Sequence, residues 1–496
     1  MDAGGNSLPS PSCPDGRKRR VCYYYDRGIA GVDYGEDHVM VPRRVDMAHA
    51  LIRSYGLLGD MSRLRTRPAT YDDIAAFHDR GYADLLGSLT PEAFAAGGEA
   101  ELTARSFNVG EPSKKEDPRS VDNPPIAGLW DYCCRYAGGS LAAARALAAG
   151  GYDIAINWSG GMHHACRDKA SGFCYVNDIV LAIRELLAAF ARVVYVDIDV
   201  HHGDGVETAF VHSGRVMTVS FHQRTNNDFF PKGRGNLADV GVGEGVYRAV
   251  NVPLYAGMDD EGYYGLFQPI MEKVMEVFKP EAIVMQCGGD SLSGDRLGRL
   301  NLSIAGHARC VRFMRSFDVP LLLLGGGGYT INHVAACWCY ETAVAIGKEI
   351  DDDIPQHCYD SYYQSQGYKL HYTVKKNLKN DNTNHHMTQT KNTVLRNLDK
   401  LAAAPSVGLD VPAGGSIDAK ALLCRRPPRE DDDPMERLHR RCGELDERGF
   451  FTELGKRQLE LELANKQDQE DGGQQTCHDW SEPVKKHRSE KLYFNY

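Results

Sequence analysis

The segment Tyr195–Gly205, YVDIDVHHGDG, carries the strongest chemical signal in the sequence. If it is extended, alternate side chains share a face, so Asp197, Asp199 and His201 point the same way while the apolar residues between them face a core. Two carboxylates at the end of an apolar strand repel each other and are poorly solvated, so they favour a bound cation. Carboxylate and imidazole ligands together suit zinc. The competing interpretation is a turn rich in Asp and Gly with ordinary paired charges.

A catalytic zinc ion takes three protein ligands and leaves one position open for water. Asp199 and His201 supply two ligands. Asp290, in the segment QCGGDSL, is the best-placed carboxylate for the third, although in isolation it could equally be a helix cap.

A histidine pair, His163–His164, follows an apolar run and two glycines. Adjacent histidines in a loop can reach one site together as general base and general acid. Asp197 and Asp204 are natural partners for their far ring nitrogens, which would fix the tautomers and raise basicity. The alternative is one hydrogen-bonded core histidine beside an exposed one.

The glycine run in GGGGYT, residues 325–330, leaves Tyr329 on a loop without neighbouring side chains to crowd the backbone. A tyrosine hydroxyl there could donate to an oxyanion that develops on a carbonyl. The run lacks the Lys–Ser/Thr ending of a phosphate-binding loop. A metal, a base, an acid and an oxyanion donor together describe hydrolysis of an amide or ester carbonyl.

The elements that must position these residues repeat one pattern, in which an apolar β-rich run stops abruptly at Gly and polar residues. These runs are Asp153–Trp158, Arg192–Val200, Val216–Phe221, Ala282–Met285 and Pro320–Leu324, and helical stretches such as Val176–Ala191 and Glu261–Phe278 lie between them. Apolar strands alternating with helices indicate an α/β fold with an open, mostly parallel central sheet and helices on both faces. In such sheets the ligand site lies beyond the carboxyl ends of the strands, where every one of these polar clusters falls.

Composition narrows the class of protein. The 496 residues are 42% hydrophobic and 25% charged with a net charge of −10, which is ordinary globular composition and argues against a general nucleic-acid binder. The 14 cysteines form no compact framework, so we expect an intracellular protein with reduced thiols, in which pairs such as Cys133–Cys134 and Cys337/Cys339 serve packing. The longest apolar run, Val319–Leu324, is too short to span a bilayer.

The domain organisation follows from changes in composition. We expect a disordered segment at 1–17, one catalytic domain at 18–411, and a charged tail at 412–496 with a helix at 434–466. The polar, proline-rich stretch Pro112–Pro125 is expected to be a loop.

The motifs INWSGGMHHA, SGFCYVNDIVLAI, YVDIDVHHGDGVE, RVMTVSFH, CGGDSLSGDRLG, LLLLGGGGYT and CWCYET resemble the motif series of the class I histone deacetylases. The resemblance covers roughly residues 18 to 408. It implies an arginase-like α/β fold and a zinc-dependent enzyme that removes acetyl groups from lysine side chains.

Position by position, the resemblance assigns Asp199, His201 and Asp290 as zinc ligands. His163 and His164 match the catalytic pair, backed by Asp197 and Asp204, and Tyr329 matches the residue that polarises the acetyl carbonyl. Phe173 and Phe230 match the walls of a narrow acetyl-lysine channel, with Gly172 and Leu297 beside them. A slot between two rings suits the aliphatic lysine stem once acetylation has removed its charge.

The family also binds potassium. One site would use Asp197, Asp199, His201, Ser220 and Phe221. A second would use Phe210, Ser213, Val216 and Arg248, mainly through carbonyl oxygens.

Three departures from the family pattern stand out. The GEDCP motif is interrupted after Glu111, so Asp122 is the candidate for the aspartate that grips the substrate backbone at the rim. The stretch HQRTNNDFFPKGRGN, which carries Phe230, is longer than usual. Of the basic residues that bind an inositol phosphate in corepressor complexes, Arg296 is retained, but Val41 and Asn332 replace the other two. Losing two charges should weaken such a site severely.

We therefore expect a nuclear enzyme, with a cytoplasmic pool left open, that acts on acetylated proteins such as histone tails in transcriptional repression. Basic runs at 17–20 and 485–488 agree with nuclear import but are also compatible with plain surface charge. Corepressor subunits remain candidate partners, and neither direct nucleic-acid binding nor a membrane role is expected. The alternatives are a deacylase of a small acylated amine and a catalytically impaired deacetylase-like scaffold.

Overall fold

The computed structural model describes residues 19–114, 117–224 and 229–401, with the backbone alone at 114 and 117–120. The N-terminal segment 1–17, the tail 412–496 with its expected helix, and the basic run at 485–488 therefore lie outside the described residues.

The core of the fold is one eight-stranded, wholly parallel sheet in the order β2-β1-β5-β10-β9-β6-β7-β8. Its strands are β1 (Val21–Tyr24), β2 (Ser62–Leu64), β5 (Ile154–Asn157), β6 (Val193–Asp197), β7 (Val216–Gln223), β8 (Ala249–Leu254), β9 (Ala282–Gln286) and β10 (Leu321–Leu324). The central strands are apolar runs buried on both faces, as parallel sheets covered by helices require. The expected α/β class with a parallel central sheet is confirmed.

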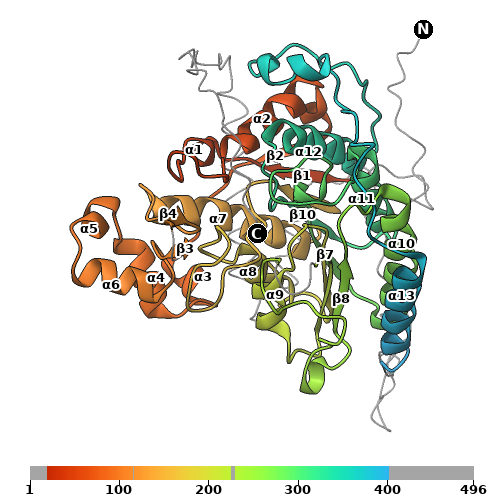
Figure 1. Cartoon of the computed structure of the whole chain (residues 1–496), viewed down its shortest axis with the longest axis horizontal. Coiled ribbons are helices and arrows are strands. Elements are labelled where there is room, and N and C mark those ends of the chain that lie inside the picture. Colours follow the sequence, from red (N-terminus) through yellow and green to blue (C-terminus); the bar gives the residue numbers. More distant parts are fainter. Residues whose placement is uncertain (1–18, 115–116, 225–228, 402–496) are drawn as a thin grey trace, which may run out of the picture.

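Helices cover both faces of the sheet (Figure 1). One face packs against α7 (Leu129–Ala148), α8 (Asp178–Leu186) and α9 (Asp204–Phe210). The other packs against α2 (Arg43–Ser54), α10 (Asp260–Phe278), α11 (Ile304–Arg315) and α12 (Ile331–Ile346), and α13 (Asn384–Leu398) lies on α10. Successive side chains along a strand point to opposite faces of the sheet and so enter different cores. Val194 and Val196 belong to one cluster, while Val193 and Tyr195 belong to the other.

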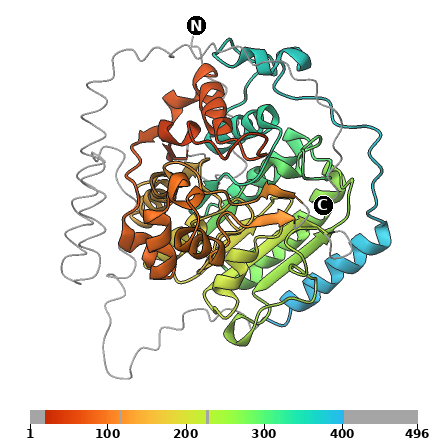
Figure 2. The same ribbon diagram turned by 60° about the vertical axis from the view of Figure 1, so that its left-hand side comes forward.

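A third core lies where α7 meets the red and orange helices of the N-terminal part of the chain in Figure 1. It includes α1 (Arg27–Ala30), α3 (Tyr71–Ala75), α4 (Arg80–Ser88), α5 (Pro91–Ala95) and α6 (Glu99–Ser106). Figure 2, turned toward this side, shows the same helices in front of the sheet.

The helix expected at Val176–Ala191 is shorter than predicted, since α8 ends at Leu186. The guanidinium of Arg215 donates to the carbonyl oxygens of Leu187, Phe190 and Ala191. The Arg215 side chain, from the loop before β7, thus satisfies carbonyl oxygens that the hydrogen bonds of a longer helix would otherwise satisfy.

The stretch Pro112–Pro125 is a β-hairpin in its first part, so the prediction of a loop is wrong there. Strands β3 (Pro112–Lys114) and β4 (Asp117–Val121) pair antiparallel, with Pro112 opposite Val121 and an irregular register between them. Proline is compatible with a two-stranded ribbon because both strands have a free edge that needs no N–H donor. The paired ends bring Glu111 and Asp122 to the base of the hairpin.

Buried cysteines fill the core as expected. The ten cysteines in the described ranges are all free and eight are buried, including Cys133, Cys134, Cys337 and Cys339. Among the described residues, no helix combines the length and apolar character needed to cross a bilayer.

His78 gives the fold a defined acid sensitivity. Its Nδ1–H donates to the Arg167 carbonyl at 3.1 Å, and its Nε2 accepts the Asn177 N–H at 3.0 Å, an arrangement that only the neutral ring can make. Burial lowers its pKa from 6.5 to about 4. The unfolded chain takes up this proton near pH 6.5 while the folded chain resists it, so stability is full above pH 6.5 and is lost as pH falls toward 4.

We expect the free energy of unfolding to fall by about 3 kcal/mol from this residue between pH 7 and pH 4. Urea unfolding of wild type and His78→Gln at several pH values in this window measures it. The variant should show a shallower pH slope, and parallel slopes would contradict the assignment.

Candidate active site

The site lies where four neighbouring strands end at the same level. Sheet register aligns Asn157, Leu324, Gln286 and Asp197, the last residues of β5, β10, β9 and β6. The loops that follow these strands carry His163–His164, the glycine run, Asp290 and Asp199–His201. The convergence therefore follows from strand order and register, as in other open parallel sheets.

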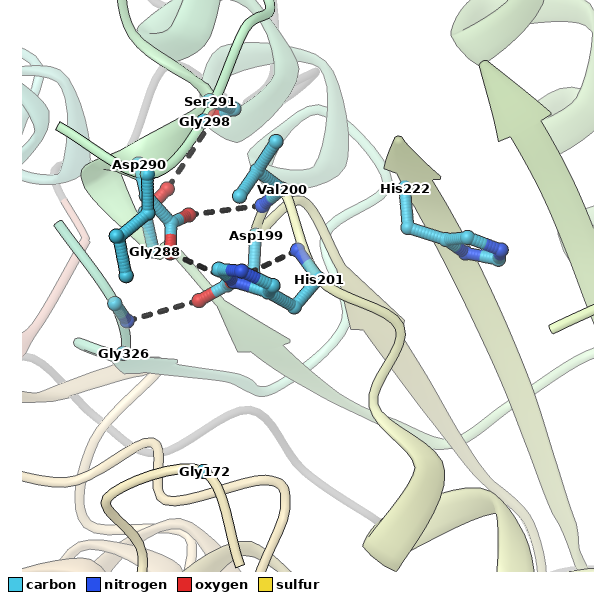
Figure 3. A network of polar contacts seen from close by, with 12 residues as sticks. Gly172, Asp199, Val200, His201, His222, Gly288, Asp290, Ser291, Gly298 and Gly326 are labelled. Carbon is cyan, nitrogen blue, oxygen red and sulfur yellow. Dashed lines mark hydrogen bonds and ion pairs between the residues drawn. The ribbon is translucent and has the colours of Figure 1, made fainter. Parts of the chain in front are cut away.

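Asp199, His201 and Asp290 form one buried group whose ligand atoms all lie within 4.8 Å of one another. Figure 3 shows the three side chains facing each other. The His201 Nδ1 lies 3.2 Å from Asp199 Oδ1 and 3.2 Å from Asp290 Oδ2. Ligands around a tetrahedral zinc ion, each about 2.0–2.1 Å from the metal, are about 3.4 Å apart. The donor set and its spacing therefore fit such an ion.

Backbone and side-chain hydrogen-bond donors outside the group hold the carboxylates of Asp199 and Asp290 in place. Gln286 Nε2 and the Gly327 N–H donate to Asp199 Oδ2 at 2.7 and 2.8 Å. The Val200 N–H donates to Asp290 Oδ1 at 2.8 Å (Figure 3). The sequence reasoning missed Gln286; a polar residue that ends an apolar strand was the available signal.

The electrostatics of the group favour a cation. Burial and the charge of Asp199 raise the pKa of Asp290 to about 7. Burial alone would lower the pKa of His201, but hydrogen bonds to Asp199 and Asp290 outweigh it and raise that pKa to about 10. Two carboxylates that share one buried position attract positive charge strongly.

His163 and His164 make the two contacts expected of them. Each Nδ1 lies 2.8 Å from a carboxylate oxygen, Asp197 Oδ2 for His163 and Asp204 Oδ1 for His164. Both rings are buried, and their centroids are 3.9 Å apart. With Nδ1 occupied, Nε2 is the atom left for proton transfer on each ring, and His163 Nε2 lies 3.9 Å from Asp199 Oδ1.

The two histidines differ in basicity. Burial lowers the pKa of His163, but the charges of Asp197 and Asp199 outweigh it and raise the value to about 9. Burial and the neighbouring His163 lower the pKa of His164 to about 4. One ring of the pair thus holds a proton while the other can accept one.

Tyr329 is buried, and its backbone N–H donates to Asp295 Oδ2 at 2.8 Å. Burial, then the charges of Asp290 and Asp199, raise the pKa of Tyr329 well above its ordinary value, so the hydroxyl stays a proton donor. Buried Arg44 donates to the carbonyl oxygens of Gly326 and Gly328 and so anchors the glycine run. Asp295 and Arg44 were not among the predicted site residues.

Aromatic rings flank the group on two sides. Phe230 meets His164 edge-on at 4.8 Å between centroids, and Phe173 meets Tyr329 edge-on at 5.7 Å. Gly172 lies between them: a Cβ on it would stand 2.4 Å from His164 Cδ2 and 2.9 Å from Phe230 Cε1, and its φ of +52° also favours glycine.

Two further residues border the same aromatic region. Leu297 packs in the same cluster as Phe173. Phe229, which the sequence reasoning passed over, stacks on His201 at 5.0 Å between centroids.

Asp122 follows the hairpin directly, and its carbonyl oxygen lies 3.3 Å from His38 Nε2. The His38 ring in turn meets Phe173 edge-on at 4.9 Å. This chain of contacts connects Asp122 to the aromatic region.

The residues predicted for potassium fall into two neighbourhoods. Ser220 lies opposite Asp197 in the sheet register, and its hydroxyl contacts His222 Nδ1 at 2.9 Å. In the second neighbourhood, the Ser213 N–H donates to the Phe210 carbonyl at 2.8 Å, and the Val216 N–H donates to the Ser213 hydroxyl at 3.2 Å. The Arg248 carbonyl accepts the Thr218 N–H on the adjacent strand.

Comparisons with known proteins agree with this geometry. A family model described as the histone deacetylase domain matches residues 38–345. Histone deacetylase 19 of Arabidopsis thaliana is 54% identical over 407 residues, 82% of this chain and 77% of that protein. Histone deacetylase 2 of Oryza sativa subsp. japonica is 52% identical over 439 residues, 88% and 81% of the two chains. Probable histone deacetylase 1-A of Xenopus laevis is 47% identical over 423 residues, 85% and 83% of the two chains. With these matches spread over most of its length, the chain belongs to the histone deacetylases, the family whose class I motifs its sequence resembles.

Proposed function

We propose that this chain removes acetyl groups from lysine side chains of histone tails with a zinc ion held by Asp199, His201 and Asp290. The observation that carries the proposal is the buried group of two carboxylates and one imidazole beside a histidine pair whose rings are each held by a further carboxylate. Carboxylate oxygen and imidazole nitrogen are both zinc ligands, and three protein ligands leave one position open for water or substrate.

Proton transfer falls to His163 and His164. When bound, a zinc ion would polarise the acetyl carbonyl and lower the pKa of a water molecule. The Nε2 atoms of the pair would accept a proton from the attacking water and deliver one to the departing lysine amine. Asp197 and Asp204 hold the two rings in orientation throughout.

Tyr329 supplies the hydrogen-bond donor for the oxyanion. A donor that is fixed before the reaction stabilises charge that appears only in the transition state. The Tyr329 backbone is tied to Asp295, and the glycine run before it is tied to Arg44, so the hydroxyl is held by the fold.

Substrate selection involves the aromatic region and the rim. Phe173 and Phe230, with Gly172 and Leu297, would enclose the aliphatic stem of acetyl-lysine, whose neutral end suits an apolar slot. Asp122 would accept hydrogen bonds from the substrate backbone at the rim. The hairpin β3–β4 stands directly beside Asp122 and so would influence which flanking sequences are preferred.

Potassium is proposed as a structural cation in two places. Asp197, Asp199, His201, Ser220 and Phe221 would hold one ion, and Phe210, Ser213, Val216 and Arg248 the other. Carbonyl and carboxylate oxygens are the ligands such hard cations prefer.

We propose a nuclear enzyme whose catalytic domain spans 18–411. Assembly with corepressor subunits through an inositol phosphate is disfavoured, because Val41 and Asn332 carry no positive charge and Asn332 instead donates to Gln366 Oε1 at 3.1 Å. The other two interpretations of the sequence, an acylated small amine as substrate and an inactive scaffold, gain no support from relatives that are all named histone deacetylases.

The direct test is turnover of an acetylated histone-tail peptide by purified protein, before and after removal of metal with a chelator. We expect activity to vanish with the metal and to return on adding one equivalent of Zn²⁺. Acetylpolyamines, assayed in parallel, should be poor substrates. Full activity in thoroughly metal-depleted protein would overturn the proposed site.

A further inference from the structure

A second buried polar cluster lies behind the metal group, on the helices that cover the sheet. It consists of His307 on α11 and Cys337 and Glu341 on α12, all fully buried. The His307 Nδ1 lies 2.6 Å from Glu341 Oε1 and 3.5 Å from Cys337 Sγ. Buried polar side chains of this kind are costly unless a hydrogen bond compensates, so their placement calls for a physical reason.

The other ring nitrogen of His307 points toward the metal group. His307 Nε2 lies 3.0 Å from the carbonyl oxygen of Gly288. A carbonyl only accepts, so Nε2 must carry a proton, whatever the protonation of Nδ1 and Glu341. The contact with Glu341 then sets the orientation of the ring, in the way that a carboxylate orients a histidine at a metal centre.

Gly288 occupies a sensitive position between the two aspartates. It directly precedes the short 3₁₀ turn η3 (Gly289–Ser291), which carries Asp290. A Cβ on Gly288 would stand 2.0 Å from Asp199 Oδ2, so its backbone packs against that carboxylate. Figure 3 shows Gly288 close to both aspartates. A shift of Gly288 would therefore displace Asp199 and Asp290 together.

Helix α12 also contacts Cys287, the residue that precedes Gly288. Trp338 Nε1, on α12, donates to the Cys287 carbonyl at 2.8 Å. Two consecutive carbonyls of the loop after β9 thus each accept a hydrogen bond from a buried side chain of the helical layer. The Ser291 hydroxyl adds a longer contact of 3.3 Å to the Gly288 carbonyl from within the turn.

We propose that His307, oriented by Glu341, is a positioning residue for the metal centre, which fixes the Gly288 carbonyl and with it the turn that carries Asp290. The inference rests on the proposed metal site at Asp199, His201 and Asp290. Residues that orient metal ligands from outside the coordination shell change metal affinity by about 10–100-fold when they are replaced.

The test compares two replacements of His307 in the full-length protein. In His307→Asn the side-chain amide reaches only about as far as Nδ1 does in the wild type, so this variant loses the hydrogen bond to Gly288. In His307→Gln the longer side chain reaches about as far as Nε2 and can restore it. We expect His307→Asn to raise the Kd for Zn²⁺, measured by competition with a chromophoric chelator, by about 10-fold or more, and His307→Gln to recover most of the loss.

Cobalt substitution gives a second measurement that does not depend on turnover. The visible absorption of bound Co²⁺ reports the geometry of its ligands, so it should change in His307→Asn and return toward wild type in His307→Gln. Glu341→Gln, which keeps the size of the side chain but weakens its hold on the ring, should give an intermediate Kd.

Thr342→Val is the matched control. Thr342 is buried on α12 beside Glu341 and accepts a hydrogen bond from Trp158 Nε1 at 2.9 Å. Its loss should lower the unfolding midpoint but leave the Kd and the Co²⁺ spectrum unchanged.

The possible outcomes distinguish a failure of the proposed role of His307 from a failure of the proposed metal site. If His307→Asn is destabilised like Thr342→Val but binds metal as wild type does, His307 serves the fold alone and the inference is overturned. If His307→Asn does not fold, Glu341→Gln decides, and an unchanged Kd in that variant overturns the inference equally. If wild type itself binds no metal, or Asp290→Asn binds it undiminished, the proposed site fails before His307 is considered.

Discussion

Gly327→Ala is expected to abolish both metal binding and deacetylation. A Cβ on Gly327 would stand 1.9 Å from Asp290 Oδ2 and 2.9 Å from Asp199 Oδ2. The added methyl group would overlap two buried carboxylates, so Asp199 and Asp290 must both move. A bound metal ion stabilises the transition state by several kcal/mol, so losing it should lower turnover on the order of 10³-fold.

Metal content per chain and turnover of an acetylated peptide are the two measurements. Gly31→Ala is the control, because an added Cβ there meets nothing within 4 Å and the φ of −85° suits alanine. The control should bind one equivalent of zinc and keep wild-type activity. A Gly327→Ala protein that did the same would contradict the placement of the glycine run against the two aspartates.

Tyr329→Phe is expected to reduce kcat by about 10²–10³-fold, the usual effect of removing one donor to a developing oxyanion. The ring of Tyr329 packs against Phe173 and beneath Arg44, and phenylalanine preserves these contacts. Only the hydroxyl is lost, so KM and metal content should stay close to wild type.

A second buried tyrosine provides the comparison. Tyr82 lies in the same hydrophobic cluster as Tyr329, and its hydroxyl donates to the Tyr175 carbonyl at 2.8 Å. Tyr82→Phe removes a buried hydrogen bond and should lower stability by about 1 kcal/mol without changing kcat. Equal kcat values for wild type and Tyr329→Phe would remove Tyr329 from the mechanism.

The sequence predicted those parts of the fold that continuous apolar runs encode. Strands β5, β6, β7, β9 and β10 appear close to their predicted positions because each is buried on both faces. The edge strand β2 was missed: its residues, Ser62–Leu64, are few and largely polar. Strand β8 was missed as well, because Asn251 and Pro253 interrupt its apolar pattern.

The residues of the candidate site likewise fall into those that the sequence predicted and those that it did not. Residues whose type and local spacing suggest chemistry, such as Asp199 and His163, could be named from the sequence. Arg44 and His307 could not, because their significance arises from contacts with residues far along the chain. Arg44, for example, bonds a carbonyl 284 positions away. No local pattern contains such information.

The hairpin illustrates a different failure. Its prolines and charges are typical of a loop, whereas pairing between Pro112 and Val121 is a property of two short segments that meet only in three dimensions. Proline counts against a strand only where the missing N–H would have been needed.

That pairing has a wider consequence, since the chain leaves the domain and re-enters it at one point. The two ends of the segment between Glu111 and Asp122 therefore lie side by side. Its length can change without changing the distance between these ends. Evolution or an engineer could lengthen, shorten or exchange it without pulling on the strand ends below, because the entropy of closing a surface loop rises only slowly with its length. If Asp122 contacts the substrate backbone as proposed, the preference for flanking peptide sequence could change in this way while the residues of the buried metal group stay the same.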